Sequence, residues 1–207
     1  MKLQSGFNNF FAMIMIKNPW VTFSLFFLLA TFIPNVHKLL NSEMYLKMLV
    51  QIPAYSILSF IIGLKLRSLN NKVILQISKH GSSALIFLFG SQTFWMIPRS
   101  LDLSVYNEAF AILLPLNLIG AGFLFGIAFK SAPFVLKTAF SIYGLAMFLA
   151  MGIIYINFNS LICAVFSIEM QHLAGKYILY VFPFVFVLFL YRLFYNMSKL
   201  TEEIIIQ

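Results

Sequence analysis

The stretch YNEAFAILLPLNLIGAGFLFGIAF, residues 106–129, decides the fold class of this chain. Its only charged residue is Glu108, and it exceeds the roughly 20 apolar residues that a helix needs to cross the hydrocarbon core of a bilayer. Gly122 and Gly126 lie four residues apart, a spacing that lets two helices approach closely inside a membrane. The stretch therefore predicts a membrane-spanning helix that packs against another helix.

Similar apolar stretches occur throughout the chain. Five of them are long enough to cross a bilayer, at residues 19–36, 45–65, 73–97, 133–156 and 174–196. The apolar stretch 157–173 is shorter, and we expect it to form a short surface or re-entrant helix. The predicted fold is all-α, a polytopic membrane helical bundle of about six transmembrane helices.

The overall composition agrees with a membrane protein. Of the 207 residues, 61% are hydrophobic and 10% are charged, whereas soluble domains average about 45–50% apolar and about 25% charged residues. The net charge of +8 does not indicate a nucleic-acid partner, because the basic residues lie scattered at the ends of apolar stretches. We therefore expect the lipid bilayer and another membrane protein as partners.

Three regions follow from the distribution of apolar residues. Residues 1–18 are expected to form an amphipathic lead-in on the membrane surface, residues 19–196 a single transmembrane domain, and residues 197–207 a cytoplasmic tail. No internal repeat is visible. An N-terminus in the cytoplasm places ten lysines and arginines on the inner side and four on the outer side. Because cytoplasmic loops are rich in basic residues, we predict a protein of the cell inner or plasma membrane with both termini in the cytoplasm.

A candidate metal site follows the first apolar stretch. His37 is followed by Met44 and Met48, and the two methionines share one face of a helix because they are four residues apart. Imidazole and thioether groups suit copper, and thioethers favour Cu(I). Methionine is also a common filler of apolar interfaces, so both interpretations stay open.

A second candidate group precedes the last apolar stretch. Glu169 and His172 share a helical face at a spacing of three residues, and Met170 lies between them. They suit a metal or a proton-handling pair, because ionisable residues near a span tend to be functional. The alternative is an ordinary polar cap on the last span. His80, in the third apolar stretch, is either a hydrogen-bonded histidine or a ligand.

The sequence FWMIPRSLD, residues 94–102, predicts a corner between two spans. Trp95 is expected to anchor at the interface, and Pro98 is expected to end the third span. Arg99 and Asp102 can pair across one helical turn, and Asp102 is also placed to cap the fourth span.

No enzyme signature accompanies these features. The chain lacks a Gly-rich phosphate loop, a nucleophile elbow and a paired-His metalloprotease motif. A single cysteine, Cys163, also rules out an internal disulfide. We therefore expect a protein without enzymatic activity.

Two segments resemble a known family. SQTFWMIPRSLDLSVYNEAF (91–110) followed by LIGAGFLFG (118–126), and MQHLAGKYILYVFPFVFVLFLYRLF (170–194), resemble parts of the CtaG-like cytochrome c oxidase assembly proteins. The shared features are a Trp-x-x-Pro element before an aspartate and a span with small residues. In the last span they are a glutamine, a small-residue pair and aromatic residues.

The resemblance implies an oxidase assembly factor that handles copper. The residues it implies for a site on the outer face are Trp95, Pro98, Asp102, Gln171 and Gly175, with His172 nearby. The chain departs from the family because residues 103–130 contain no histidine. An accessory subunit of a larger respiratory or oxidase-type complex, without its own metal, is the alternative, and a small transporter is the third hypothesis.

Overall fold

The computed structural model describes residues 19–67, 72–158 and 160–205, and within these ranges every regular element is a helix. The all-α prediction is thus confirmed, whereas the predicted lead-in at 1–18 lies outside the described residues. Contacts divide the chain into two compact units, Met1–Pro133 and Phe134–Gln207. The single domain at 19–196 stays a prediction.

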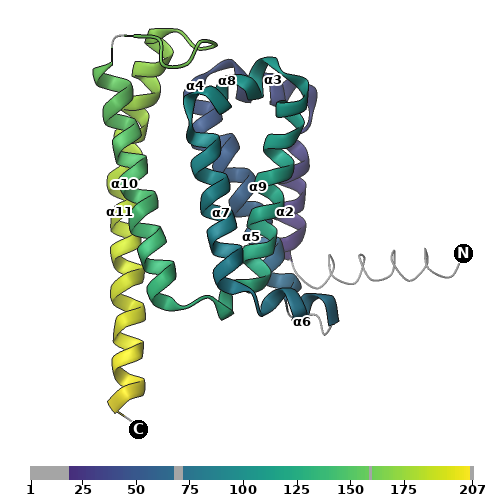
Figure 1. The fold of residues 1–207 in the computed structure, drawn as a ribbon, viewed down its shortest axis with the longest axis vertical. Coiled ribbons are helices and arrows are strands. Elements are labelled where there is room, and N and C mark those ends of the chain that lie inside the picture. The colour runs from purple at the N-terminus through teal and green to yellow at the C-terminus, as the bar shows by residue number, and fades with distance from the viewer. Residues whose placement is uncertain (1–18, 68–71, 159, 206–207) are drawn as a thin grey trace, which may run out of the picture. The chain divides into compact units, whose positions relative to one another are not determined.

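The first unit consists of long helices joined by short ones. In chain order it contains α2 (Pro19–Ala30), α3 (Pro34–Ser42), α4 (Met44–Leu46), the π-helix η1 (Lys47–Gln51), α5 (Ile52–Leu66), α6 (Lys72–Ser78), α7 (Gly81–Met96), α8 (Pro98–Tyr106), α9 (Glu108–Ala128) and the 3₁₀-helix η2 (Phe129–Ser131). Helices α2, α5, α7 and α9 run alongside one another, and the short helices α3 and α8 lie at the same end (Figure 1).

Two copies of one arrangement make up this unit, although no repeat is visible in the sequence. Each copy has a long helix, a nine-residue helix and a second long helix. Both nine-residue helices start with a proline after an isoleucine, with φ/ψ of −63°/128° at Ile33 and −65°/129° at Ile97. Proline suits the first helical position because no helix partner exists there for an N–H group. The two copies therefore share mainly their backbone geometry and not their amino-acid sequence.

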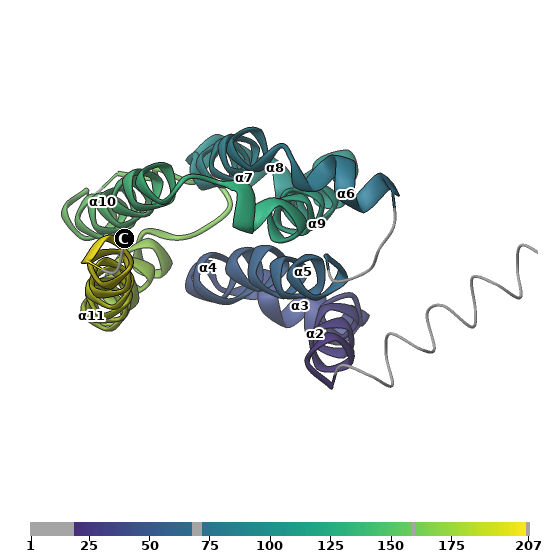
Figure 2. The same cartoon turned by 90° about the horizontal axis from the view of Figure 1, so that it is seen from below.

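The two copies meet where α5 crosses α9, between α2 and α7 (Figure 2). Gly63 of α5 leaves room for the carbonyl oxygen of Phe123, and Gly126 of α9 leaves room for that of Phe60. A Cβ atom on either glycine would lie closer than 3.0 Å to that oxygen. Gly122 likewise packs on Ser59 and its neighbours. The helix contact predicted from Gly122 and Gly126 is confirmed, and Ser59-x-x-x-Gly63 is its counterpart.

Within the described residues, four helices are long and apolar enough to cross a membrane, and the number rises to six if two bent helix pairs each count as one span. The four are Met44–Leu66, Glu108–Ser131, Phe134–Asn157 and Ile168–Ser198. The bent pairs are α2 with α3 and α6 with α7, each bent by 74°.

The bends correct two predicted spans. The stretch 19–36 is not one helix, because α2 ends at Ala30 and Pro34 begins α3 instead of ending the span. The stretch 73–97 is interrupted before Gly81, which packs so closely on the backbone of η2 that a Cβ would not fit. His80 is therefore the N-cap residue of α7, at the break between α6 and α7, and does not lie inside a continuous helix.

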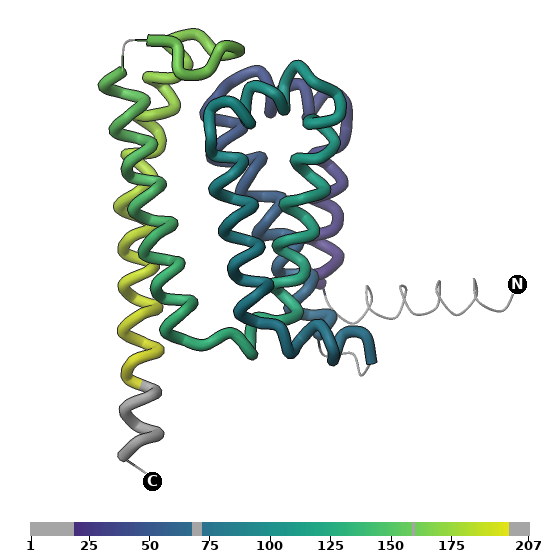
Figure 3. Tube along the Cα trace, in the orientation of Figure 1, coloured from purple at the N-terminus to yellow at the C-terminus, as the bar shows by residue number. Residues whose placement is uncertain are grey.

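The second unit is a pair of long helices, α10 (Phe134–Asn157) and α11 (Ile168–Ile205), which run side by side (Figure 3). Gly175 faces Gly152, and a Cβ on Gly175 would lie 2.9 Å from the Gly152 carbonyl oxygen. The described residues of 158–167 form bends, so the predicted helix near 157–173 is wrong. The last helix, α11, continues to Ile205, and the cytoplasmic tail at 197–207 stays a prediction.

Candidate functional site

A buried lysine marks the end of the first unit where α3 and α8 lie. Lys47 opens the π-helix η1 and is only 2% exposed. Its Nζ atom donates to Asn41 Oδ1 at 2.7 Å and lies 3.5 Å from the carbonyl oxygen of Ser104. Burying an ammonium group costs several kcal/mol unless other groups compensate. Two neutral oxygens, one from α3 and one from α8, therefore stabilise this charge.

The lysine determines the orientation of the Asn41 amide and, through it, the tautomer of His37. Because a lysine can only donate, Asn41 must present its oxygen to Lys47 and its NH₂ group to His37. The Asn41 Nδ2 atom lies 2.9 Å from His37 Nε2, which must then accept. A neutral His37 accordingly carries its proton on Nδ1.

His37 Nδ1 faces the side chain of Gln51 at 3.4 Å. Gln51 is 2% exposed, and its Nε2 also lies 3.2 Å from the Tyr55 hydroxyl, whereas Oε1 has no partner among the described residues. Amide oxygen and nitrogen are assigned from hydrogen bonding. Turning the amide places its oxygen against the His37 N–H group and moves its NH₂ group to the position without a partner. In either orientation one atom of the Gln51 amide lacks a partner.

These residues form a polar cluster, which we define as His37, Asn41, Lys47, Gln51 and Tyr55. The cluster links α3 to the start of the long helix and, through Ser104, to α8. It carries the Lys47 ammonium and a Gln51 amide oxygen that lacks a partner among the described residues. Of its members the sequence singled out only His37. Polar residues at 47, 51 and 55, spaced four apart in an apolar helix, were the available signal.

The predicted corner at 94–102 is present, but its residues have other roles. Trp95 is 1% exposed and donates from Nε1 to Asn117 Oδ1 at 3.0 Å, so it is a core residue and not an interfacial anchor. Pro98 occupies the first turn of α8, after α7 has ended at Met96, as predicted.

Asp102 does not cap the start of α9. Asp102 is 3% exposed whereas Arg99 is exposed, and their pairing stays a prediction. The start of α9 is capped by Asn107, whose side chain accepts from the backbone N–H groups of Ala109 and Phe110. Asn107 directly precedes α9, whereas Asp102 lies within α8.

The structure assigns the predicted metal ligands to two different units. In the first unit Met44 and Met48 are buried at 0% and 4% exposure, on the elements that follow the helix of His37. Both ring nitrogens of His37 face amide groups of the polar cluster.

The ligands predicted in the second unit lie in the first turns of α11. Glu169 is exposed, Met170 is half-buried, and His172 Nε2 lies 3.4 Å from the Phe158 carbonyl oxygen. Across the described ranges, no three or more His, Cys, Asp or Glu residues are grouped so that they could hold a metal.

Gln171 holds the segment between α10 and α11. Its side chain is 1% exposed, and its Oε1 accepts from the Ile162 N–H group at 3.2 Å. Its Nε2 donates to the carbonyl oxygens of Cys163 at 3.3 Å and Phe166 at 3.1 Å. The bends replace the predicted helix because this one side chain satisfies backbone groups that helix formation would otherwise pair.

Replacing Gln171 with alanine is expected to open this segment. Cys163 is the only cysteine and is fully buried, and each lost hydrogen bond contributes about 0.5–1.5 kcal/mol. Labelling of Cys163 by a thiol reagent in the folded protein should become at least tenfold faster in Gln171→Ala, since about 1.4 kcal/mol corresponds to a factor of ten. In the His172→Ala control, which loses only a 3.4 Å contact, the rate should not change. Equal rates in both variants would contradict the role of Gln171.

Comparison of the chain with protein-family models, with characterised proteins and with solved structures gives no match.

Proposed function

We propose that this chain is a non-enzymatic membrane protein that acts as an assembly factor or accessory subunit of a larger respiratory, oxidase-type complex. One observation carries the proposal. Trp95, Asp102 and Gln171, which the family resemblance implies for a site, are each at most 3% exposed. Trp95 joins α7 to α9, and Gln171 organises the segment before α11. Because these side chains are buried and two of them join elements of the fold, they support a structural role for the motifs shared with the family.

The proposal includes a topology of six spans with both termini in the cytoplasm. Counting each bent helix pair as one span gives six. The even number of spans agrees with the excess of basic residues on one side, ten against four. In addition, α3 lies between α2 and α5, and α8 lies between α7 and α9. These two connecting helices lie at the same end of the first unit, as expected for spans that alternate in direction (Figure 1).

Copper handling is the second candidate function. It is favoured by three candidate ligands on consecutive elements, His37 on α3, Met44 on α4 and Met48 on η1. Both α4 and η1 pack against α3. Thioethers and one imidazole form a ligand set suited to Cu(I). Copper binding would require the His37 ring to leave at least one amide partner, either Asn41 or Gln51.

Deleting the gene in the cells that produce this chain is expected to lower the amount of assembled haem–copper oxidase by at least half. The haem absorbance and the oxygen consumption of isolated membranes measure this amount. A gene copy expressed from a plasmid should restore both. Membrane ATP synthase activity serves as the control and should not change. Normal oxidase content after deletion would overturn the proposal.

The rescue experiment also separates the two candidate functions. A His37→Ala/Met48→Leu variant removes two of the candidate copper ligands, and Met151→Leu in α10 is the matched methionine control. Rescue by both variants supports an accessory role without metal. Failure of the first variant alone, restored by added copper, supports copper handling. Membrane levels of each variant, measured by an affinity tag, show whether a failure reflects loss of the protein.

A further inference from the structure

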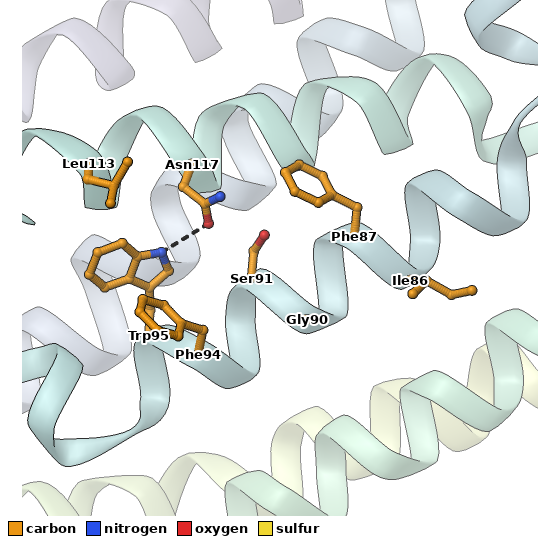
Figure 4. A pocket seen from close by; sticks show the side chains of 8 residues that line it. All are labelled: Ile86, Phe87, Gly90, Ser91, Phe94, Trp95, Leu113 and Asn117. Carbon is orange, nitrogen blue, oxygen red and sulfur yellow. Dashed lines mark hydrogen bonds between the residues drawn. The ribbon is translucent and has the colours of Figure 1, made fainter.

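A pocket of about 390 Å³ lies between α7 and α9. This volume is within the range of about 300–1,000 Å³ that is typical of ligand sites. Aromatic side chains of α7, namely Phe87, Phe94 and Trp95, form much of its lining (Figure 4). Phe94 and Trp95 pack edge to face, with ring centroids 5.0 Å apart and an angle of 82° between the planes. The walls therefore suit a flat apolar molecule.

Two polar groups line this apolar pocket. Asn117 extends from α9, and its oxygen already accepts from the indole N–H group of Trp95, so its NH₂ group remains as a donor (Figure 4). Ser91 lies on the facing side of the pocket in α7, and in the described part of the chain no residue bonds to its hydroxyl group. A few polar groups in an apolar pocket are typical of sites that orient a small ligand.

The position of Asn117 restricts the ligands that can reach it. Asn117 is the tenth of the 21 residues of α9, close to the middle of a helix long enough to cross the membrane. Only a molecule that dissolves in the hydrocarbon core has access to that depth. An acyl chain would fill the pocket without using the Asn117 donors, whereas a ring carbonyl would accept from them.

We propose that this pocket binds a lipid-soluble quinone, with a ring carbonyl accepting from Asn117 and the ring lying against the exposed rings of Phe87 and Phe94, near Trp95. This inference does not depend on an oxidase-type complex, because it rests on the groove between α7 and α9 and on α9 crossing the membrane. Gly90 contributes to the space, since a Cβ added there meets no atom within 4 Å. A larger side chain at Gly90 can therefore enter the pocket without a clash in the helix bundle.

Tryptophan fluorescence provides the test, because the chain has two tryptophans and only Trp95 lines the pocket. In a Trp20→Phe background, a short-chain benzoquinone is expected to quench Trp95 in a saturable manner. Gly90→Phe should weaken the apparent affinity at least tenfold by filling the pocket. Asn117→Leu should weaken it at least fivefold by removing the donor. Circular dichroism in the same detergent shows whether each variant has folded.

The matched control is Gly120→Phe. Gly120 also has no atom within 4 Å of an added Cβ, but it does not line the pocket. The affinity of Gly120→Phe for the quinone should therefore equal that of the parent protein. Quenching that does not saturate, or that is equal in Gly90→Phe and Gly120→Phe, would overturn the proposal. Displacement of the quinone by a long-chain fatty acid at equal concentration would also overturn it, since the pocket would then be an acyl-chain groove.

Discussion

Replacing Gly63 with leucine is expected to prevent the first unit from folding stably. The new Cβ would lie closer than 3.0 Å to the Phe123 carbonyl oxygen and 3.1 Å from the Ile127 nitrogen. Both are backbone atoms of α9, so no side chain can rotate away and the two helices must separate. Overpacking commonly costs about 1–3 kcal/mol even where side chains can adjust. We expect a loss above about 3 kcal/mol, a large part of the typical 5–15 kcal/mol of folding stability.

Thermal unfolding in detergent, followed by circular dichroism, measures this loss. Gly120→Leu is the matched control because an added Cβ there meets nothing within 4 Å. Leucine has a higher helix propensity than glycine by up to about 1 kcal/mol, so the control should be equally or slightly more stable than the parent. Similar unfolding temperatures for the two variants would show that α5 and α9 do not cross as closely as described.

Removing Asn41 is expected to destabilise the first unit more than removing the lysine that it binds. Asn41→Ala removes the 2.7 Å hydrogen bond of the buried Lys47 ammonium and leaves it the Ser104 carbonyl oxygen at 3.5 Å. A hydrogen bond to a charged group contributes about 1.5–3 kcal/mol, and His37 also loses its 2.9 Å partner. We expect Asn41→Ala to lower the free energy of unfolding by about 2–4 kcal/mol. Lys47→Met removes the buried charge together with its desolvation cost, so its net effect should stay within about 1 kcal/mol.

A double-mutant cycle checks this order. The Asn41→Ala/Lys47→Met protein should recover at least about 1 kcal/mol relative to Asn41→Ala, because no charge is left without its partner. Lys38→Met on the same short helix is the control, and because Lys38 is exposed it should have little effect. If Asn41→Ala and Lys47→Met lowered the free energy of unfolding equally, the prediction would be wrong, because the ammonium group itself would then stabilise the fold.

The apolar stretches predicted the helical fold because a helix pairs its own backbone groups wherever the surroundings are apolar. The Gly122 and Gly126 spacing also predicted a close helix contact correctly. The sequence did not identify the partner surface, Ser59 and Gly63 of α5, because small residues permit contact without specifying which helix provides it. The breaks at 31–33 and 79–80 depend on contacts with other helices, such as that of Gly81 with η2.

The candidate site was predicted less well, for a related reason. His37 was singled out by its chemistry, but its partners Asn41 and Gln51 are common residue types whose roles depend on how α3 packs on η1. Lys47 was counted only as a charge that orients the chain, because a lysine at the end of a span is usually exposed. Gln171 was implied by the family resemblance, but its three backbone partners lie five to nine residues before it, in a segment without regular structure.

The length of α11 has a consequence for what this chain presents outside the bilayer. Its 38 residues, at 1.5 Å of rise each, extend for about 57 Å. The hydrocarbon core is only about 30 Å thick, and even a helix tilted by 40° crosses it within about 39 Å. About 18 Å of α11, roughly three helical turns in all, must therefore lie outside the hydrocarbon core, divided between its two ends, as helix surface that a soluble protein can contact.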